Sequence, residues 1–159
     1  MKTSFRILTF LFAVTTVVFC TSAKKPEMAI SAQPKATIIN LEANDMMKYN
    51  LTVLKAVAGR PIKLTLKHTG KFPITAMGHN VVFLKPGTDV DNFASEALGS
   101  KDTQYIPASK KASVIAHTKL LGGGESDTIT FTVAKKGTYT FICSFPGHYT
   151  MMKGKLIVE

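Results

Sequence analysis

The chain has 159 residues, a formal net charge of +10 at pH 7 and 45% hydrophobic residues. This length is enough for one domain with its own core. The positive charge favours acidic partners or anionic surfaces through long-range steering. Basic residues such as Lys55, Arg60 and Lys136 are scattered and form no aromatic-basic stripe, which argues against nucleic-acid binding.

The first 23 residues have the pattern of a signal peptide. Lys2 and Arg6 precede an apolar run over residues 7–19, and the small residues at 21–23 suit a signal peptidase. The run of about 13 residues is short of the roughly 20 that span a bilayer as a helix. We therefore expect residues 1–23 to be a removable signal peptide and expect no membrane span.

The segment around the expected cleavage site has an alternative interpretation and is followed by a polar stretch. In a rival interpretation Cys20 is the lipidated first residue of an anchored protein, although the preceding Phe19 is bulky where such sites usually have a small residue. Residues 24–35 are polar, contain two prolines and are expected to form an N-terminal tether. The folded domain is then predicted to span residues 36–159.

Short segments with a period of two fill most of this domain. Ile62, Leu64 and Leu66 alternate with polar residues, as expected of a half-buried strand. Segments 129–133 and 139–143 alternate in the same way, 81–84 is an apolar strand, and 156–158 form a last strand. Turn signals separate them about every ten residues, which predicts an antiparallel sandwich or barrel.

Two interruptions break the strand pattern. Residues 89–99 have apolar residues at helical spacing, with Asp89 or Asp91 available as the cap, so one inserted helix is predicted. Gly122-Gly123-Gly124 is interpreted as a turn, because no GxxxxGK[ST] pattern supports a phosphate-binding loop.

Cys143 is the only cysteine left after the signal peptide. A lone thiol in an exported protein cannot form an internal disulfide, so burial, a partner chain or a metal must account for it. His148 follows five residues later and Met151-Met152 close behind, on a loop between two predicted strands. His79, directly after Gly78, could add a second imidazole from another part of the sheet.

One thiolate, two imidazoles and a distant thioether match the trigonal copper site of electron-transfer proteins. Structural zinc is the competing metal, but zinc usually takes four Cys or His ligands in paired spacings such as CxxC. Taken singly, a buried Cys is usually a small hydrophobe and a Met usually fills core gaps. Their occurrence together on one strand-connecting loop favours the copper interpretation.

At these residues the chain resembles the azurin family of cupredoxins, which are type 1 blue copper proteins. The matching stretches are Met77-Gly78-His79-Asn80, residues 114–120, residues 143–148 and Met152-Lys153-Gly154, with a weaker match at Asn44-Asp45 and Met47. The resemblance covers nearly all of residues 36–159. It implies a cupredoxin-like Greek-key β-sandwich of about eight strands with one short inserted helix.

The resemblance also implies a ligand set. His79, Cys143 and His148 would be the equatorial ligands of one copper ion, and Met152 the weak axial sulfur, since Met151 is one residue short of the family spacing. The Gly78 carbonyl oxygen would face the metal from the opposite side. The backbone N–H groups of Asn80 and Phe145 would donate to the cysteine sulfur. The family's apolar docking surface around the second histidine matches Phe72, Ala76, Met77, Phe145, Pro146 and Met151.

This chain departs from the family pattern at several positions. The positions of the family's disulfide fall at about Thr37 and Gly59, so that crosslink is absent. His68 matches a non-ligating histidine, but Thr69 replaces the proline that follows it in the family. His117 is expected to be structural or exposed.

The function implied is that of an electron carrier, with redox proteins such as cytochromes or copper/haem reductases as partners. A copper-handling or partner-binding cupredoxin that does not cycle electrons is the alternative. An enzyme is not expected, because a second catalytic copper needs further histidines and the chain has only four. The expected location is the periplasm, with lipid anchoring open, and the expected state is a monomer.

Overall fold

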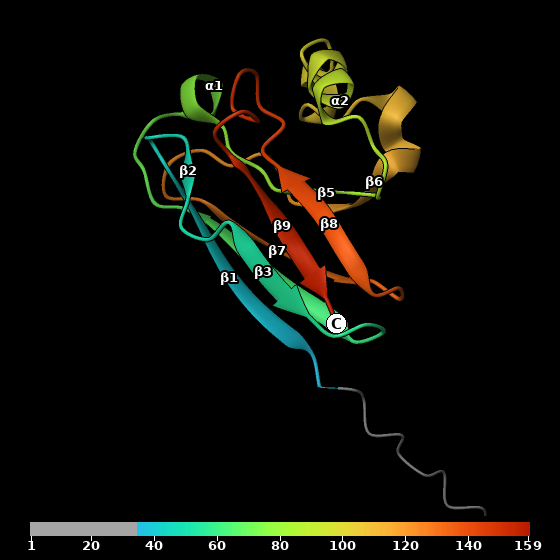
Figure 1. Ribbon diagram of the computed structural model, residues 1–159. Coiled ribbons are helices and arrows are strands. Elements are labelled where there is room, and N and C mark those ends of the chain that lie inside the picture. Colours follow the sequence, from blue (N-terminus) through green and yellow to red (C-terminus); the bar gives the residue numbers. More distant parts are fainter. Residues whose placement is uncertain (1–34) are drawn as a thin grey trace, which may run out of the picture. The chain divides into compact units, whose positions relative to one another are not determined.

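Two β-sheets enclose the main hydrophobic core in the computed structural model, which describes residues 35–159 (Figure 1). The first sheet has the order β2-β1-β4-β7 and the second the order β3-β9-β8-β5-β6. The strands are β1 (Thr37–Asn44), β2 (Lys48–Tyr49), β3 (Val53–Ala56), β4 (Pro61–His68), β5 (Val82–Leu84), β6 (Val114–His117), β7 (Ser126–Thr132), β8 (Gly137–Ile142) and β9 (Lys153–Val158). The all-β prediction is confirmed, with nine strands in place of about eight. The predicted signal peptide, Cys20 and all but the last residue of the predicted tether lie outside the described residues.

The strand pairing is mixed, which differs from the predicted antiparallel arrangement. Strand β1 pairs with β4 in parallel, and β3 pairs with β9 in parallel, while the remaining pairs are antiparallel. Parallel neighbours need a long connection between them, so they join segments far apart in the chain. Local alternation of apolar and polar residues carries no information about such partners.

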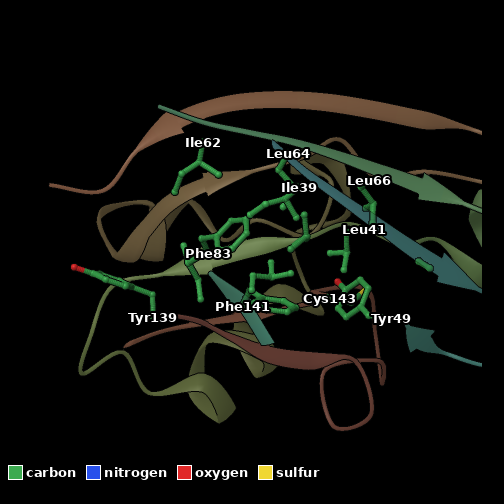
Figure 2. Close-up of a cluster of buried hydrophobic side chains, with 14 of the residues drawn as sticks. Ile39, Leu41, Tyr49, Ile62, Leu64, Leu66, Phe83, Tyr139, Phe141 and Cys143 are labelled. Atoms are coloured by element: carbon green, nitrogen blue, oxygen red, sulfur yellow. The ribbon is translucent and has the colours of Figure 1, made fainter. Parts of the chain in front are cut away.

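Side chains from both sheets form one continuous core (Figure 2). On β4, Ile62, Leu64 and Leu66 are fully buried, which confirms the predicted alternation. On the opposite sheet Phe83 lies with its ring centroid 4.8 Å from Phe131 and 5.6 Å from the ring centroid of Phe141. Each side chain of this size contributes about 1.5–3 kcal/mol when fully buried. The core thus provides a rigid support for the loops at its ends.

The predicted helix is present as α2 (Val90–Ala97). The Asp89 side chain accepts a hydrogen bond from the Asn92 backbone N–H at 3.0 Å and caps the first turn. Phe93 on this helix packs with Val82 and Ile142 in a second, smaller buried cluster. Strand β5 is therefore buried on both faces, in agreement with its wholly apolar sequence.

Shorter helical segments were not predicted. They are α1 (Ile74–Met77) and two 3₁₀ turns, η1 (Lys101–Thr103) and η2 (Ala108–Ser113). Segment α1 has four residues and no side-chain cap, so its sequence carries no helical period to detect. Within residues 35–159, no helix is long and apolar enough to cross a membrane.

The register of two neighbouring strands determines where the candidate ligands meet. In the antiparallel pair β5 and β8, Val82 lies opposite Ile142. His79 stands three residues before Val82, and Cys143 directly follows Ile142. Because antiparallel strands place the start of one beside the end of the other, both residues emerge at the same end of the sandwich.

Gly154 in β9 is predicted to tolerate no side chain. A Cβ at this position would press into the Phe141 ring and the Thr52 carbonyl oxygen. Gly154→Ala should therefore lower the free energy of unfolding by about 1–3 kcal/mol, the usual cost of overpacking. Gly99→Ala is the matched control, since the nearest atom to its added Cβ lies 3.9 Å away. Urea unfolding of both variants tests this, and equal losses would contradict it.

Candidate metal centre

The loop between β8 and β9 folds three predicted ligands toward one another. The Cys143 N–H donates to the Met152 carbonyl oxygen at 2.9 Å, and the Met152 N–H donates to the His148 carbonyl oxygen at 2.8 Å. The His148 N–H donates to the Phe145 carbonyl oxygen at 3.0 Å. Gly147 has φ +79°, a left-handed conformation that glycine adopts without strain. These bonds close the loop into a compact turn above the core.

His79 reaches the same place from the segment before β5. Its N–H and carbonyl group exchange hydrogen bonds with the backbone of Leu121, at 3.0 and 2.8 Å. Its Nε2 lies 2.9 Å from the Asn44 carbonyl oxygen. A carbonyl oxygen only accepts hydrogen bonds, so Nε2 carries the proton and the His79 Nδ1 lone pair is free. A free Nδ1 is the form of imidazole that binds a metal.

The three predicted equatorial donors converge in the buried interior. The Cys143 Sγ lies 3.9 Å from the His79 Nδ1 and 3.7 Å from the His148 Nδ1, and the two Nδ1 atoms are 3.2 Å apart. All three side chains are buried, and their ligand atoms lie within 4.8 Å of one another. One sulfur and two nitrogens with no carboxylate suit copper better than structural zinc. The donor set therefore fits a copper ion.

The two methionines of the loop differ sharply in exposure. Met152 is fully buried, whereas Met151 is 59% exposed. Gly78, on the other ligand segment, has its carbonyl oxygen 3.9 Å from the Cys143 Sγ. A Cβ on Gly78 would come within 2.8 Å of the Phe145 ring, so only glycine fits this close packing. The burial pattern thus favours Met152 over Met151 as the residue facing the site.

Burial keeps the metal-free donors neutral. It raises the pKa of the Cys143 thiol to about 11, against the opposing effect of the Asn80 and Phe145 backbone N–H groups that donate to the sulfur. It lowers the pKa of His79 to about 4, although the hydrogen bond to Asn44 opposes this. Burial, with a smaller effect of His68, also lowers the pKa of His148. At neutral pH the metal-free cluster is therefore one thiol and two uncharged imidazoles.

Asn80 links the two segments that carry the donors. The Ser144 N–H donates to the Asn80 Oδ1 at 2.9 Å, and the Asn80 Nδ2 donates to the Ser144 Oγ at 2.9 Å. The Asn80 Nδ2 also lies 3.3 Å from the Gln104 carbonyl oxygen. Both Asn80 and Ser144 are buried, so these bonds have no competition from water. Sequence reasoning had assigned only the backbone N–H of Asn80 a role and had missed Ser144.

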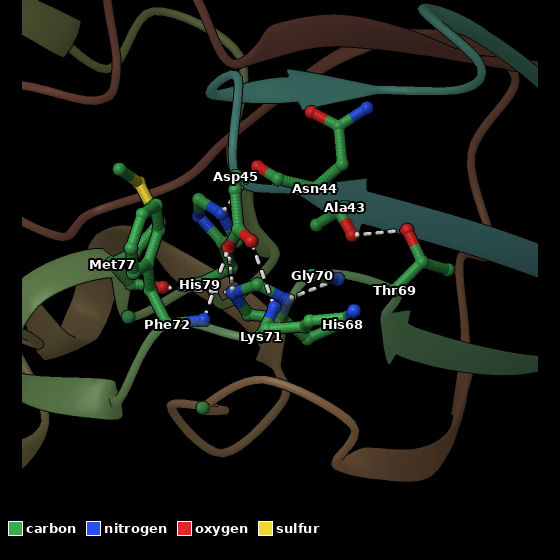
Figure 3. A network of polar contacts seen from close by, with 12 residues as sticks. Ala43, Asn44, Asp45, His68, Thr69, Gly70, Lys71, Phe72, Met77 and His79 are labelled. Carbon is green, nitrogen blue, oxygen red and sulfur yellow. Dashed lines mark hydrogen bonds and ion pairs between the residues drawn. The ribbon is translucent and has the colours of Figure 1, made fainter.

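A second polar network lies beside His79 (Figure 3). The His68 Nδ1 accepts from the Gly70 N–H at 3.0 Å, and its Nε2 donates to the Met77 carbonyl oxygen at 2.9 Å. Both ring nitrogens are thus engaged, and His68 lies outside the donor cluster, as the resemblance implied. The Asp45 carboxylate accepts from the Lys71 N–H at 2.7 Å and holds the following loop. Asp45 was not predicted to be part of the site.

His117 is exposed on β6 and does not belong to the cluster, in agreement with its predicted structural or exposed role.

Comparison with known proteins agrees with this geometry. A family model described as copper binding proteins, plastocyanin/azurin family, matches residues 35–159. Azurin-2 of Alcaligenes xylosoxydans xylosoxydans is 42% identical over 129 residues, which are 79% of this chain and 97% of that protein. Outer membrane protein H.8 of Neisseria gonorrhoeae is 42% identical over 119 residues, and the match covers 73% of this chain but only 64% of that longer protein.

The solved structures give the same fold. Auracyanin A, a "blue" copper protein from Chloroflexus aurantiacus, has 30% sequence identity and a TM-score of 0.71, and the match covers 79% of this chain and 100% of that one. An azurin from Methylomonas sp. strain J has 33% identity and a TM-score of 0.70, with 77% and 98% covered. The chain belongs to the plastocyanin/azurin family of copper-binding proteins, whose cofactor is copper.

Proposed function

We propose that this protein is a blue-copper carrier of single electrons and not an enzyme. The buried cluster of Cys143, His79 and His148 carries the proposal, because its three donor atoms lie within 4.8 Å of one another. This set would hold one copper ion. Met152, buried in the same loop, would supply a weaker sulfur ligand, and the Gly78 carbonyl oxygen faces the same cluster, 3.9 Å from the Cys143 Sγ.

Bound copper would supply a reversible one-electron couple between Cu(I) and Cu(II). The chain's own residues keep the surroundings of that couple constant. The hydrogen bond from Nε2 to Asn44 fixes the His79 ring, and the loop bonds fix Cys143 and His148. Burial of all three side chains excludes water from the donors. A site that rearranges little on gaining or losing an electron suits transfer better than catalysis.

The His148 ring is the proposed route between the site and a partner. It is 4% exposed, and its centroid lies 4.6 Å from the Phe145 ring. Phe72 and Met151, which match the family's docking surface, are 53% and 59% exposed. An apolar rim of this kind favours weak, quickly dissociating contacts. Partners would be redox proteins such as cytochromes or copper/haem reductases.

We also propose export to the periplasm, with residues 1–23 as a signal peptide, 24–35 as a tether and 36–159 as the copper-binding domain. Lipidation at Cys20 is the rival to simple cleavage. One of the relatives is named an outer membrane protein, which agrees with a protein working outside the cytoplasm. Mass spectrometry of the mature protein separates a free N-terminus from a lipid-modified Cys20.

An intense blue absorption band is expected when the purified protein takes up one equivalent of Cu(II). The band arises from charge transfer between the Cys143 thiolate and the metal, so it should bleach with mild reductant and return on reoxidation. Cys143→Ser should abolish it, because a hydroxyl does not reproduce this transition. Exposed His117→Gln is the control and should stay blue. Copper binding without the blue absorption band would contradict the electron-carrier proposal and favour a copper-handling function.

Copper binding should also release about one proton per metal ion at pH 8. The thiol, with its pKa raised to about 11, is protonated in the metal-free protein and must lose its proton to bind. The two imidazoles, whose pKa values are lowered, are already neutral and release none. A pH indicator in weakly buffered solution measures the release. Proton-free uptake of copper would show that Cys143 is not a ligand.

Met152→Ala should leave copper bound but raise the reduction potential. The Met152 thioether would donate weakly to copper and stabilise Cu(II) more than Cu(I), so its loss would favour the reduced state. The variant should also lose about 2–5 kcal/mol of stability through the cavity left by a fully buried side chain. Cyclic voltammetry and urea unfolding give the two values, with exposed Met151→Ala as the control. Complete loss of copper would contradict the ranking of ligands.

A further inference from the structure

Tyr49 is a buried tyrosine close to the candidate metal centre. It is not one of the candidate ligands, so its burial needs another explanation. It is the last residue of β2, is 8% exposed and belongs to the same buried cluster as Cys143 (Figure 2). Its ring packs edge-on against Phe141 with a centroid distance of 5.6 Å. Burial, with a smaller effect of Cys143, raises the pKa of the phenol well above its ordinary value, so the hydroxyl keeps its proton at neutral pH.

The hydroxyl donates a hydrogen bond to the carbonyl oxygen of Asn80. Every other polar group of Asn80 is also engaged. Its side chain is bound to Ser144, and hydrogen bonding from its backbone N–H acts to lower the pKa of the Cys143 thiol. The Tyr49 hydroxyl thus supplies the hydrogen bond to the Asn80 carbonyl oxygen.

The hairpin that carries Tyr49 holds the ligand segment at two successive residues. Tyr49 pairs with Ala43 across the β1–β2 turn. The neighbouring Asn44 carbonyl oxygen accepts from the His79 Nε2, and the Tyr49 hydroxyl donates to Asn80. The first contact orients an imidazole. The second fixes the backbone next to the sulfur.

We propose that the Tyr49 hydroxyl is a positioning group that holds the Asn80 N–H against the Cys143 sulfur and thereby raises the reduction potential of the site. The effect on the reduction potential rests on the proposed electron-carrier function. An N–H donor withdraws electron density from a ligating sulfur and favours the reduced metal. Loosening Asn80 weakens that donor, so loss of the hydroxyl lowers the potential.

Tyr49→Phe tests the inference, since it keeps the ring against Phe141 and removes only the hydroxyl. Tyr139→Phe is the matched control. Tyr139 is also buried, at 6% exposure, and its hydroxyl donates to the Lys135 carbonyl oxygen at 2.7 Å. Lys135 precedes β8, so this bond lies at the opposite end of that strand from Cys143. Both variants lose one hydroxyl–carbonyl hydrogen bond, buried at Tyr49 and partly buried at Tyr139. A role limited to the overall stability of the fold predicts no specific effect on the Asn80 amide in either variant.

Two readouts separate positioning from stability. In the copper-free protein, exchange of the Asn80 amide hydrogen, followed by NMR, should be about tenfold faster in Tyr49→Phe than in Tyr139→Phe. In the copper-loaded protein, the reduction potential should fall in Tyr49→Phe and stay at the wild-type value in Tyr139→Phe. Equal Asn80 exchange in the two variants, or faster exchange with an unchanged potential, overturns the inference. A colourless wild-type copper complex overturns the electron-carrier function instead, and the amide measurement still decides the positioning role.

Discussion

The rest of the structure depends on bringing a thiol and two imidazoles together in the buried end of a β-sandwich. Burial opposes any charge on these groups, and it keeps them neutral until a metal takes the place of a proton. Each donor must also be oriented by a contact that leaves its metal-binding atom free. The Asn44 carbonyl oxygen does this for His79, because it takes the proton-bearing Nε2 and leaves Nδ1 exposed to the cluster. Hydrogen bonds to the far side of the candidate ligands thus contribute to the site together with the donor atoms.

These orienting contacts arise from how the strands are arranged. The antiparallel register of β5 and β8 places the segments of His79 and Cys143 at one end, and the β1–β2 hairpin meets them there. The parallel pairing of β1 with β4 brings the end of β1, with Asn44, to the end of β4, with His68. The polar network around Asp45, His68 and His79 follows directly from that alignment. Sheet topology and site chemistry are therefore linked through a few backbone carbonyl groups.

Some of the strands, the helix and the donor residues could be predicted from the sequence, whereas the strand partners and the orienting contacts could not. Strand β4 and helix α2 were predictable because burial imposes a period on Ile62, Leu64 and Leu66 and because Asp89 is a typical cap. The donors were predictable because copper selects few residue types at a short spacing. The parallel pairs were not, since non-local pairing leaves no local period. The contacts of Ser144 and Tyr49 with Asn80 could not be predicted, because a hydrogen bond to a residue distant in sequence leaves no local pattern.

The disulfide that the resemblance places at about Thr37 and Gly59 is absent from this chain. Its position shows that the contacts that support the candidate site lie in one part of the fold. Thr37 and Gly59, where the resemblance places that disulfide, lie near the starts of β1 and β4, the far end from Asn44 and His68. Backbone bonds remain there, since the Gly59 N–H donates to the Val133 carbonyl oxygen at 2.9 Å. A covalent bond at that end would lower the entropy of the unfolded chain. It would not touch the hydrogen bonds that orient His79 or hold Asn80. The absence of this crosslink therefore concerns the stability of the fold, because the contacts that orient His79 and hold Asn80 lie at the other end of these strands.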